Sequence, residues 1–152
     1  MSSISRRLPL AAAFAAVALT IAPFSPVGAA ESATVEVWKS PTCGCCGGWI
    51  KHMQAAGFKV TSHDIDDVDP VKRMAGVPDR LASCHTAFID GYVVEGHVPA
   101  ADVRRLLAER PKARGLSAPG MPQSSPGMDM PGQPYEVVLF GGLQGDSVYA
   151  RH

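Results

Sequence analysis

The chain has 152 residues, about the size of a single domain. Its 14 basic and 14 acidic side chains balance to a formal charge of zero at pH 7. A protein that binds nucleic acid needs a concentration of basic residues, so we exclude nucleic acid as a partner.

Residues 1–30 have the pattern of a secretory signal peptide. Arg6 and Arg7 precede an apolar run, and small residues at 27–30 offer a cleavage site. The run is about 15 residues long, whereas about 20 are needed to span a bilayer, and no later segment is apolar enough to do so. We therefore expect a periplasmic protein without a membrane span in the mature chain, exported by the general or the twin-arginine route.

Removal of this peptide would leave a single domain over residues 31–152. The peptide carries two arginines and no acidic residue, so the mature chain has 12 basic and 14 acidic residues, a formal charge of −2. Its four cysteines enter an oxidising compartment, where thiols tend to pair, and four cysteines allow three pairings. The sequence does not choose among the three.

The first elements alternate between strand and helix. Residues 34–39 alternate apolar and polar side chains, which predicts a strand. After the first cysteines, apolar residues recur at helical spacing up to Gly57, a typical helix stop. A second strand is expected over 58–65, and Pro70 opens a short helix that ends near Gly76.

A hairpin and a third helix follow. Residues 86–94 form two runs of β-branched and aromatic side chains joined by Asp90 and Gly91, the residue pair that suits a type I′ turn. Pro99 then begins a helix whose apolar positions share one face, opposite its arginines.

The last part of the chain changes in composition. Residues 110–134 contain six prolines, four glycines and three methionines, so we expect an irregular segment that is too polar to form core. Strand character returns at 135–140 and 147–150 around a glycine-rich turn, which predicts a second hairpin that joins the main sheet.

The element order predicts a thioredoxin-like α/β fold: a mixed sheet with flanking helices, extended by the irregular segment and the C-terminal hairpin. Three thiols, Cys43, Cys45 and Cys46, then lie at the first strand-to-helix turn. Backbone N–H groups and the helix dipole favour thiolate over thiol there and lower a cysteine pKa. Thioredoxins place a proline opposite these thiols, just before the hairpin. Cys84 or His85 stands at that point here, so a fourth sulfur is expected to face the other three.

These cysteines fit three kinds of site. Cys43 and Cys46 have the Cys-X-X-Cys spacing of a redox pair, and we expect these two to carry any redox catalysis. Structural disulfides are the second possibility, although three thiols in four positions are unusual for a staple. A third thiol, Cys45, would compete in disulfide chemistry, which disfavours a simple redox pair. Clustered thiolates suit the soft ion Cu(I), so a metal site is favoured. Adjacent thiolates would bridge more than one ion, and four thiolates would neutralise four Cu(I).

Further copper ligands are predicted among the histidines and methionines. His85 is a candidate because it follows Cys84, and His97 is a second candidate. Thioethers of the irregular segment are also of a type that suits Cu(I): Met121, Met128 and Met130. Two more histidines are expected at solvated positions without a role: His52 and His63.

Several motifs, taken in their order, resemble the CopG-type periplasmic copper-resistance proteins. They are Cys-Gly-Cys-Cys-Gly at 43–47, Ser-Cys-His-Thr-Ala at 83–87, Gly-Tyr-Val-Val-Glu-Gly-His-Val-Pro at 91–99, and the later glycine and methionine motifs at 115–122 and 125–128. The resemblance runs from about Val35 to Arg151. It implies a thioredoxin-like fold, a multinuclear Cu(I) site on the four cysteines and a redox role in copper handling.

Two functional classes follow. The first is a protein of copper resistance and homeostasis that stores and passes Cu(I), or interconverts Cu(I) and Cu(II) through dithiol and disulfide chemistry. Its partners would be copper ions and other periplasmic copper-handling proteins. The second is a thiol-disulfide oxidoreductase that acts on protein cysteines, with copper incidental. Cys45 and Cys84 favour the first class, because a redox pair needs only Cys43 and Cys46.

Overall fold

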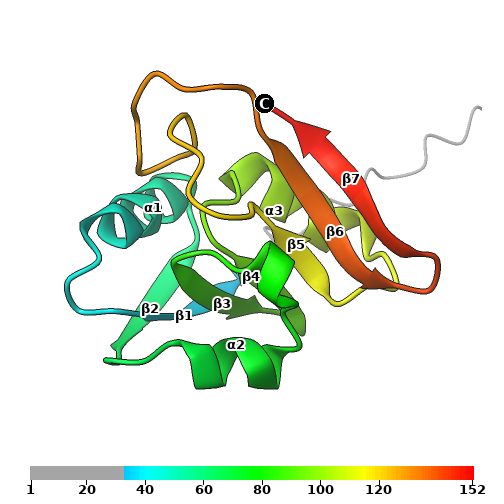
Figure 1. Cartoon of the computed structure of the whole chain (residues 1–152), viewed down its shortest axis with the longest axis horizontal. Helices are drawn as coiled ribbons and strands as arrows, with labels where there is room; N and C mark the ends of the chain where they lie inside the picture. Colours follow the sequence, from blue (N-terminus) through cyan, green and yellow to red (C-terminus); the bar gives the residue numbers. More distant parts are fainter. Residues whose placement is uncertain (1–32) are drawn as a thin grey trace, which may run out of the picture.

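The computed structural model describes residues 33–152, so the predicted signal peptide lies outside the described residues. The described chain forms a seven-stranded mixed sheet with three α-helices (Figure 1). Over this range, no helix is both long enough and apolar enough to cross a membrane.

The sheet has the strand order β2-β1-β3-β4-β5-β6-β7. The strands are β1 (Thr34–Lys39), β2 (Lys59–Asp64), β3 (His85–Ile89), β4 (Tyr92–Glu95), β5 (Gly115–Ser117), β6 (Glu136–Gly142) and β7 (Gly145–Arg151). β1 pairs parallel with β2, β4 pairs parallel with β5, and the other neighbours are antiparallel. The predicted mixed α/β sheet is therefore confirmed, and the element order is consistent with a thioredoxin-like arrangement.

The helices are α1 (Gly44–Ala55), α2 (Asp69–Ala75) and α3 (Ala100–Glu109), with a short 3-10 turn at Asp79–Leu81. Two hydrophobic clusters fill the two sides of the sheet. The larger cluster packs α1 and α3 against strand residues that include Val94, and the smaller packs α2 against strand residues that include Val93. These neighbours enter opposite clusters because successive strand residues point to opposite faces.

The predicted hairpin turn is present between β3 and β4. Asp90 and Gly91 have φ angles of 48° and 84°, and a type I′ turn requires positive φ at both central residues. The C-terminal hairpin of β6 and β7 also joins the main sheet, as expected, and it does so beside β5.

One expectation for residues 110–134 is wrong, because Gly115–Ser117 forms a buried strand between β4 and β6. Three residues are too few to show a hydrophobic period, and their burial comes from the two flanking strands. Gly115 is needed there, since a Cβ atom would lie 1.8 Å from the carbonyl oxygen of Val93. Leu116, in the middle of β5, belongs to the larger core cluster.

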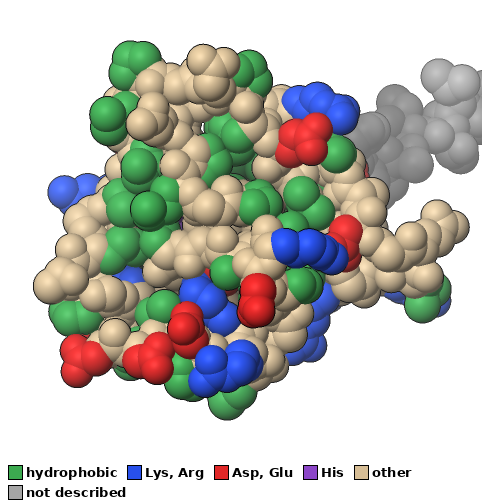
Figure 2. All heavy atoms as spheres, in the orientation of Figure 1, with side chains coloured by type: hydrophobic (Ala, Val, Ile, Leu, Met, Phe, Trp, Pro, Cys, Tyr) green, Lys and Arg blue, Asp and Glu red, His purple; other side chains and the backbone are tan. Residues whose placement is uncertain are grey.

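Residues 118–134, called the strap below, contain no helix or strand. Figure 1 shows the strap (yellow to orange) arching from β5 towards α1 and back to β6. In Figure 2, hydrophobic side chains gather on this face over α1 and the strap, while most of the visible charged side chains lie towards α2 and towards β6 and β7. The strap thus closes the end of the sheet at which α1 begins.

Candidate metal centre

The thiol turn, residues 40–46, joins β1 to α1. The backbone N–H of Cys43 donates to the carbonyl of Ser40 at 3.1 Å and closes the turn. Cys43 is the N-cap residue of α1, and Cys45 and Cys46 lie in the first turn of that helix. The first N–H groups of a helix have no helical acceptor, so together with the helix dipole they favour negative charge at this point.

Two of the three thiols in this turn are oxidised. Cys43 and Cys46 form a disulfide with their Cα atoms 5.4 Å apart, while Cys45 and Cys84 are free. The Cys45 sulfur lies 3.6 Å from that of Cys43. The structure therefore shows Cys43 and Cys46 joined and the two remaining thiols unpaired.

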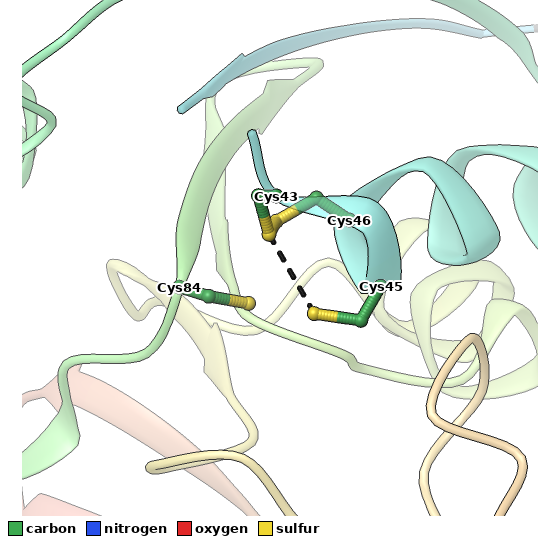
Figure 3. A group of neighbouring side chains, drawn as sticks. All are labelled: Cys43, Cys45, Cys46 and Cys84. Atoms are coloured by element: carbon green, nitrogen blue, oxygen red, sulfur yellow. Dashed lines mark hydrogen bonds between the residues drawn. A yellow bond between two sulfur atoms is a disulfide. The ribbon is translucent and has the colours of Figure 1, made fainter. Parts of the chain in front are cut away.

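Cys84 lies just before β3 and points across at the thiol turn (Figure 3). The sulfur atoms of all four cysteines lie within 4.8 Å of one another. The fold thus brings Cys84 to the thiol turn although it follows Cys46 by 38 positions in the chain. This agrees with the expectation that a fourth sulfur faces the other three.

The Cys84 thiol is protonated at neutral pH in the metal-free protein. Burial raises the pKa of Cys84 to about 11, and the neighbouring Cys45 adds to this rise. A thiol binds metal as thiolate, so an ion that binds Cys84 must displace its proton.

His97 is fully buried and has a defined tautomer. Its Nδ1 lies 2.7 Å from the carbonyl oxygen of Pro126, which only accepts, so Nδ1 carries the proton. Nε2 therefore keeps its lone pair, and it lies 3.0 Å from the sulfur of Cys84. Burial lowers the pKa of His97, which favours the neutral ring. A ring that donates one N–H to a carbonyl and presents the other nitrogen is the usual form of a metal-binding histidine.

His85 is also fully buried, and its Nδ1 lies 3.5 Å from the sulfur of Cys84. Its Nε2 has no hydrogen-bond partner among the described residues. Burial lowers the pKa of His85 well below its usual value, and the neighbouring His97 and Lys72 lower it further, so the ring is neutral. A buried polar atom without a hydrogen-bond partner costs about 1–3 kcal/mol of folding free energy. His85 is therefore a candidate to bind a metal ion or another group.

Both predicted histidines thus lie beside the predicted thiols. Donor atoms of Cys46, Cys84, His85 and His97 form a second group within 4.8 Å of one another. Cys46 and Cys84 belong to both groups, so one side of the centre offers only sulfur and the other adds two imidazoles. The soft ion Cu(I) prefers the side that offers only sulfur, whereas Cu(II) or Zn(II) also binds to imidazole nitrogen.

The strap meets the centre at Pro126 and Gly127. A Cβ atom on Gly127 would lie 2.4 Å from the backbone nitrogen of Trp49 and 2.8 Å from the carbonyl oxygen of Cys45, so only glycine fits against α1 there. Sequence reasoning missed the contribution of Pro126, because a backbone carbonyl leaves no signal in residue type.

The methionines are placed differently from one another. Met128 follows Gly127 and is partly buried, whereas Met121 is 58% exposed. The strap therefore brings the chain around Met128 to the centre, and copper ligation by either sulfur stays a prediction.

The expectation for His52 is wrong. His52 is partly buried, and its Nε2 accepts the backbone N–H of Ala100 at 3.0 Å, at the start of α3. It therefore links α1 to α3, a role that helical spacing does not reveal. The Nε2 of His63 lies 2.6 Å from a carboxylate oxygen of Glu36, and both side chains are partly exposed.

Comparison with known proteins finds one family and two solved structures that are similar to this chain. A family described as "Protein of unknown function, DUF411" matches residues 81–128. No curated protein gives a match. Two solved structures, "Copper resistance protein copG" in Form 2 and Form 1, are 46% and 47% identical, each with a TM-score of 0.75. They cover 80% of this chain, which in turn covers 99% and 98% of theirs. This chain therefore belongs to the CopG family of copper-resistance proteins.

Proposed function

We propose that this protein binds several Cu(I) ions on Cys43, Cys45, Cys46 and Cys84 when its disulfide is reduced. The observation that carries the proposal is the convergence of these four sulfur atoms within 4.8 Å of one another. Thiolates are soft ligands that select Cu(I), and a compact set without carboxylates disfavours hard ions such as Mg²⁺ and Ca²⁺.

The spacing favours a cluster over a single ion. Cys45 and Cys46 are adjacent in one helical turn, so their sulfur atoms do not easily converge on one ion and instead bridge neighbouring ions. Four thiolates balance the charge of four Cu(I) ions, which sets the expected upper count.

Copper binding is coupled to the redox pair. Two Cu(II) ions accept one electron each from the thiolates of Cys43 and Cys46, the S–S bond forms, and two Cu(I) ions result. Protons that the thiols still held are released to solvent. His85 and His97 supply the nitrogen donors that suit an arriving Cu(II), and Cys84 holds the ion between them and the thiol turn.

The proposed setting is the periplasm, where a copper-resistance protein would meet Cu(I), Cu(II) and other copper-handling proteins. The pattern of residues 1–30 supports export, and both related structures are of copper-resistance proteins. The redox pair also lies at the start of α1, the position that thioredoxins use for theirs.

The test is an anaerobic mixing experiment with the reduced, metal-free mature protein. Cu(II) is added, Cu(I) is followed with a selective chelator, and free thiols are counted. We expect two Cu(I) ions for each disulfide formed. If no Cu(I) appears and all thiols are retained, the redox function is wrong. Storage or delivery of copper would then be the function that remains.

A substitution tests the ligand set separately. Cys84→Ser should lower the number of bound Cu(I) ions sharply, whereas His63→Gln, outside both donor groups, should leave it unchanged. Full copper loading of the Cys84→Ser protein would show that Cys84 does not belong to the site.

The closed Cys43–Cys46 disulfide at a helix start also fits a thiol-disulfide oxidoreductase. Such an enzyme needs neither Cys45 nor Cys84. This second function would be favoured by two results together. The protein would exchange with a disulfide-containing peptide at a rate that Cys84→Ser does not change, and it would have no affinity for copper.

A further inference from the structure

Glu95 is a fully buried carboxylate at the end of β4, directly opposite Thr86 of β3. Its Oε1 accepts from the ammonium of Lys72 at 2.6 Å and from the backbone N–H of Ser83 at 2.6 Å. Its Oε2 accepts from the hydroxyl of Thr86 at 2.7 Å. Lys72 is itself buried and also donates to the Thr86 hydroxyl at 3.2 Å.

These contacts lie on either side of the Cys84 and His85 pair. Ser83 precedes the pair and Thr86 follows it, so one carboxylate holds both ends of the segment. The carbonyl of His85 is fixed as well, since it accepts the backbone N–H of Gly96 at 2.9 Å. The segment that presents a sulfur and an imidazole to the centre is therefore held at each end.

The same carboxylate residue also fixes the start of the strap. The backbone N–H of Ala118 donates to the carbonyl of Glu95 at 3.0 Å, and the Ser83 hydroxyl donates to the carbonyl of Gly120. The packing is close, because a Cβ atom on Gly96 would lie 2.3 Å from the Ser83 hydroxyl oxygen. A shift of Ser83 would thus move both the Cys84 segment and the strap.

Stability alone is a weak reason to bury this ion pair. Removing two charges from water is costly, and replacing a buried pair with apolar side chains of similar size is often neutral or stabilising. Breaking the pair by removing one partner, in contrast, leaves an uncompensated buried charge and destabilises strongly. A test must therefore change Lys72 and Glu95 together.

We propose that Lys72 and Glu95 are positioning residues, a buried clamp that holds Cys84 and His85 at the distance at which they complete the metal centre. The clamp acts through its hydrogen bonds to Ser83 and Thr86. The part of the inference that concerns copper affinity rests on the proposed function, and the geometry of Cys84 is testable without copper.

Two double variants separate the hydrogen bonds from the fold. Lys72→Met with Glu95→Leu removes the clamp, whereas Lys72→Met with Glu95→Gln removes the charges and keeps a side chain that bonds Ser83 and Thr86. The matched control, Glu36→Gln with His63→Gln, removes a partly exposed pair from the same sheet. Thermal unfolding of all three establishes that each protein is folded.

The first readout is Cu(I) affinity of the reduced protein, measured anaerobically by chelator competition. The Leu variant should bind at least about tenfold more weakly, the cost typical of losing a residue that orients a ligand. The Gln variant and the control should stay within about threefold of the wild type. In a Cys84→Ser background, the Leu change should have no further effect.

The second readout needs no metal. In Cys45→Ser protein with the disulfide closed, Cys84 is the single free thiol of the chain, and its alkylation rate by a neutral reagent reports its position. The Leu change should raise this rate severalfold, and the Gln change should restore it. If wild-type protein bound no copper, the proposed function would fail. The alkylation rates of Cys84 would still show whether Lys72 and Glu95 hold Cys84 in position.

Any of three results would overturn the clamp. The Leu variant could keep the wild-type alkylation rate and Cu(I) affinity, or the Leu and Gln variants could lose Cu(I) affinity equally. The third result is a loss of Cu(I) affinity, caused by the Leu change, that persists in the Cys84→Ser background. Should the Leu variant fail to fold, Thr86→Val replaces it, because it removes the two hydrogen bonds of the Thr86 hydroxyl, to Glu95 and from Lys72, at nearly constant size. A Thr86→Val protein with unchanged affinity and unchanged Cys84 reactivity would contradict the inference in the same way.

Discussion

The two sides of the metal centre are built in different ways. The thiol turn is a single local segment whose Cys43 and Cys46 are already joined, and the fold of α1 alone brings them together. The histidine side, made of Cys84, His85 and His97, comes from the start of β3 and the loop after β4 and is held by the strap. The thiol turn is thus formed by residues close together in the chain, whereas the histidine side is fixed by tertiary contacts.

This difference assigns different tasks to the two sides. In the proposed function, electrons come from the pair that closes a disulfide, and a fixed position for the ion comes from donors that cannot close one with each other. Substitutions on the two sides should therefore fail in different ways.

The largest effect is expected from Cys43→Ser, which removes the redox pair. Cu(II) mixed anaerobically with this variant should yield no Cu(I) coupled to a Cys43–Cys46 disulfide, whereas Cys45→Ser should retain that reaction. Peptide mapping of the products identifies the bond. Undiminished Cu(I) formation by Cys43→Ser would show that the thiol turn is not the source of electrons.

A smaller loss is expected from His97→Ala on the histidine side. The variant keeps the dithiol but loses a nitrogen donor, so the rate of Cu(II) reduction should fall on the order of 10- to 100-fold while the final thiol count is unchanged. Stopped-flow measurement of Cu(I) appearance gives the rate, with His63→Ala as the control. An unchanged rate of Cu(II) reduction would show that His97 does not bind Cu(II) before it is reduced.

The raised pKa of Cys84 predicts how Cu(I) binding depends on pH. Burial raises this pKa to about 11, so at neutral pH a Cu(I) ion must release a proton to bind this sulfur. Affinity should therefore rise with pH, by about tenfold per unit for this one proton, and the slope should fall by one proton in Cys84→Ser. Equal slopes in the two proteins, measured by chelator competition between about pH 6 and 8, would contradict this assignment.

The smallest effect is expected where the strap meets the thiol turn. Gly127→Ala puts a Cβ atom against α1 at a φ of +87°, so the strap should shift and cost about 1–3 kcal/mol of unfolding free energy. Because Pro126 then moves away from His97, Cu(II) reduction should slow severalfold. Gly120→Ala is the matched control, since its φ of +67° is also positive but a Cβ atom there has open space. Similar losses in both variants would mean that packing against α1 is unimportant.

Much of the fold was predictable from local patterns. The Asp90 and Gly91 pair marks its turn because few residues adopt positive φ, and the strand before the cysteines shows a clear alternation. β5 was not predictable, because its pairing with β4 and β6 comes from distant segments and its three residues carry no period.

The candidate site was predictable in its donors and not in its support. The thiol spacing and the place of Cys84 before a hairpin are visible in the sequence. Glu95 and Lys72 gave no signal, because a single charge next to an apolar strand looks the same whether its partner is water or a buried ammonium. Pro126 contributes only its backbone carbonyl, so its bond to His97 also required the structure.

The most direct test of a copper cluster is a count of Cu(I) ions bound by the same mature protein in two states, dithiol and disulfide. Anaerobic Cu(I) titration with metal analysis should give several ions per chain when Cys43 and Cys46 are reduced. With the disulfide closed, only Cys45 and Cys84 remain as free thiols, and the count should fall to a single ion or none. Equal counts in the two states, or no Cu(I) bound by the reduced protein, would contradict a copper cluster built on these four cysteines.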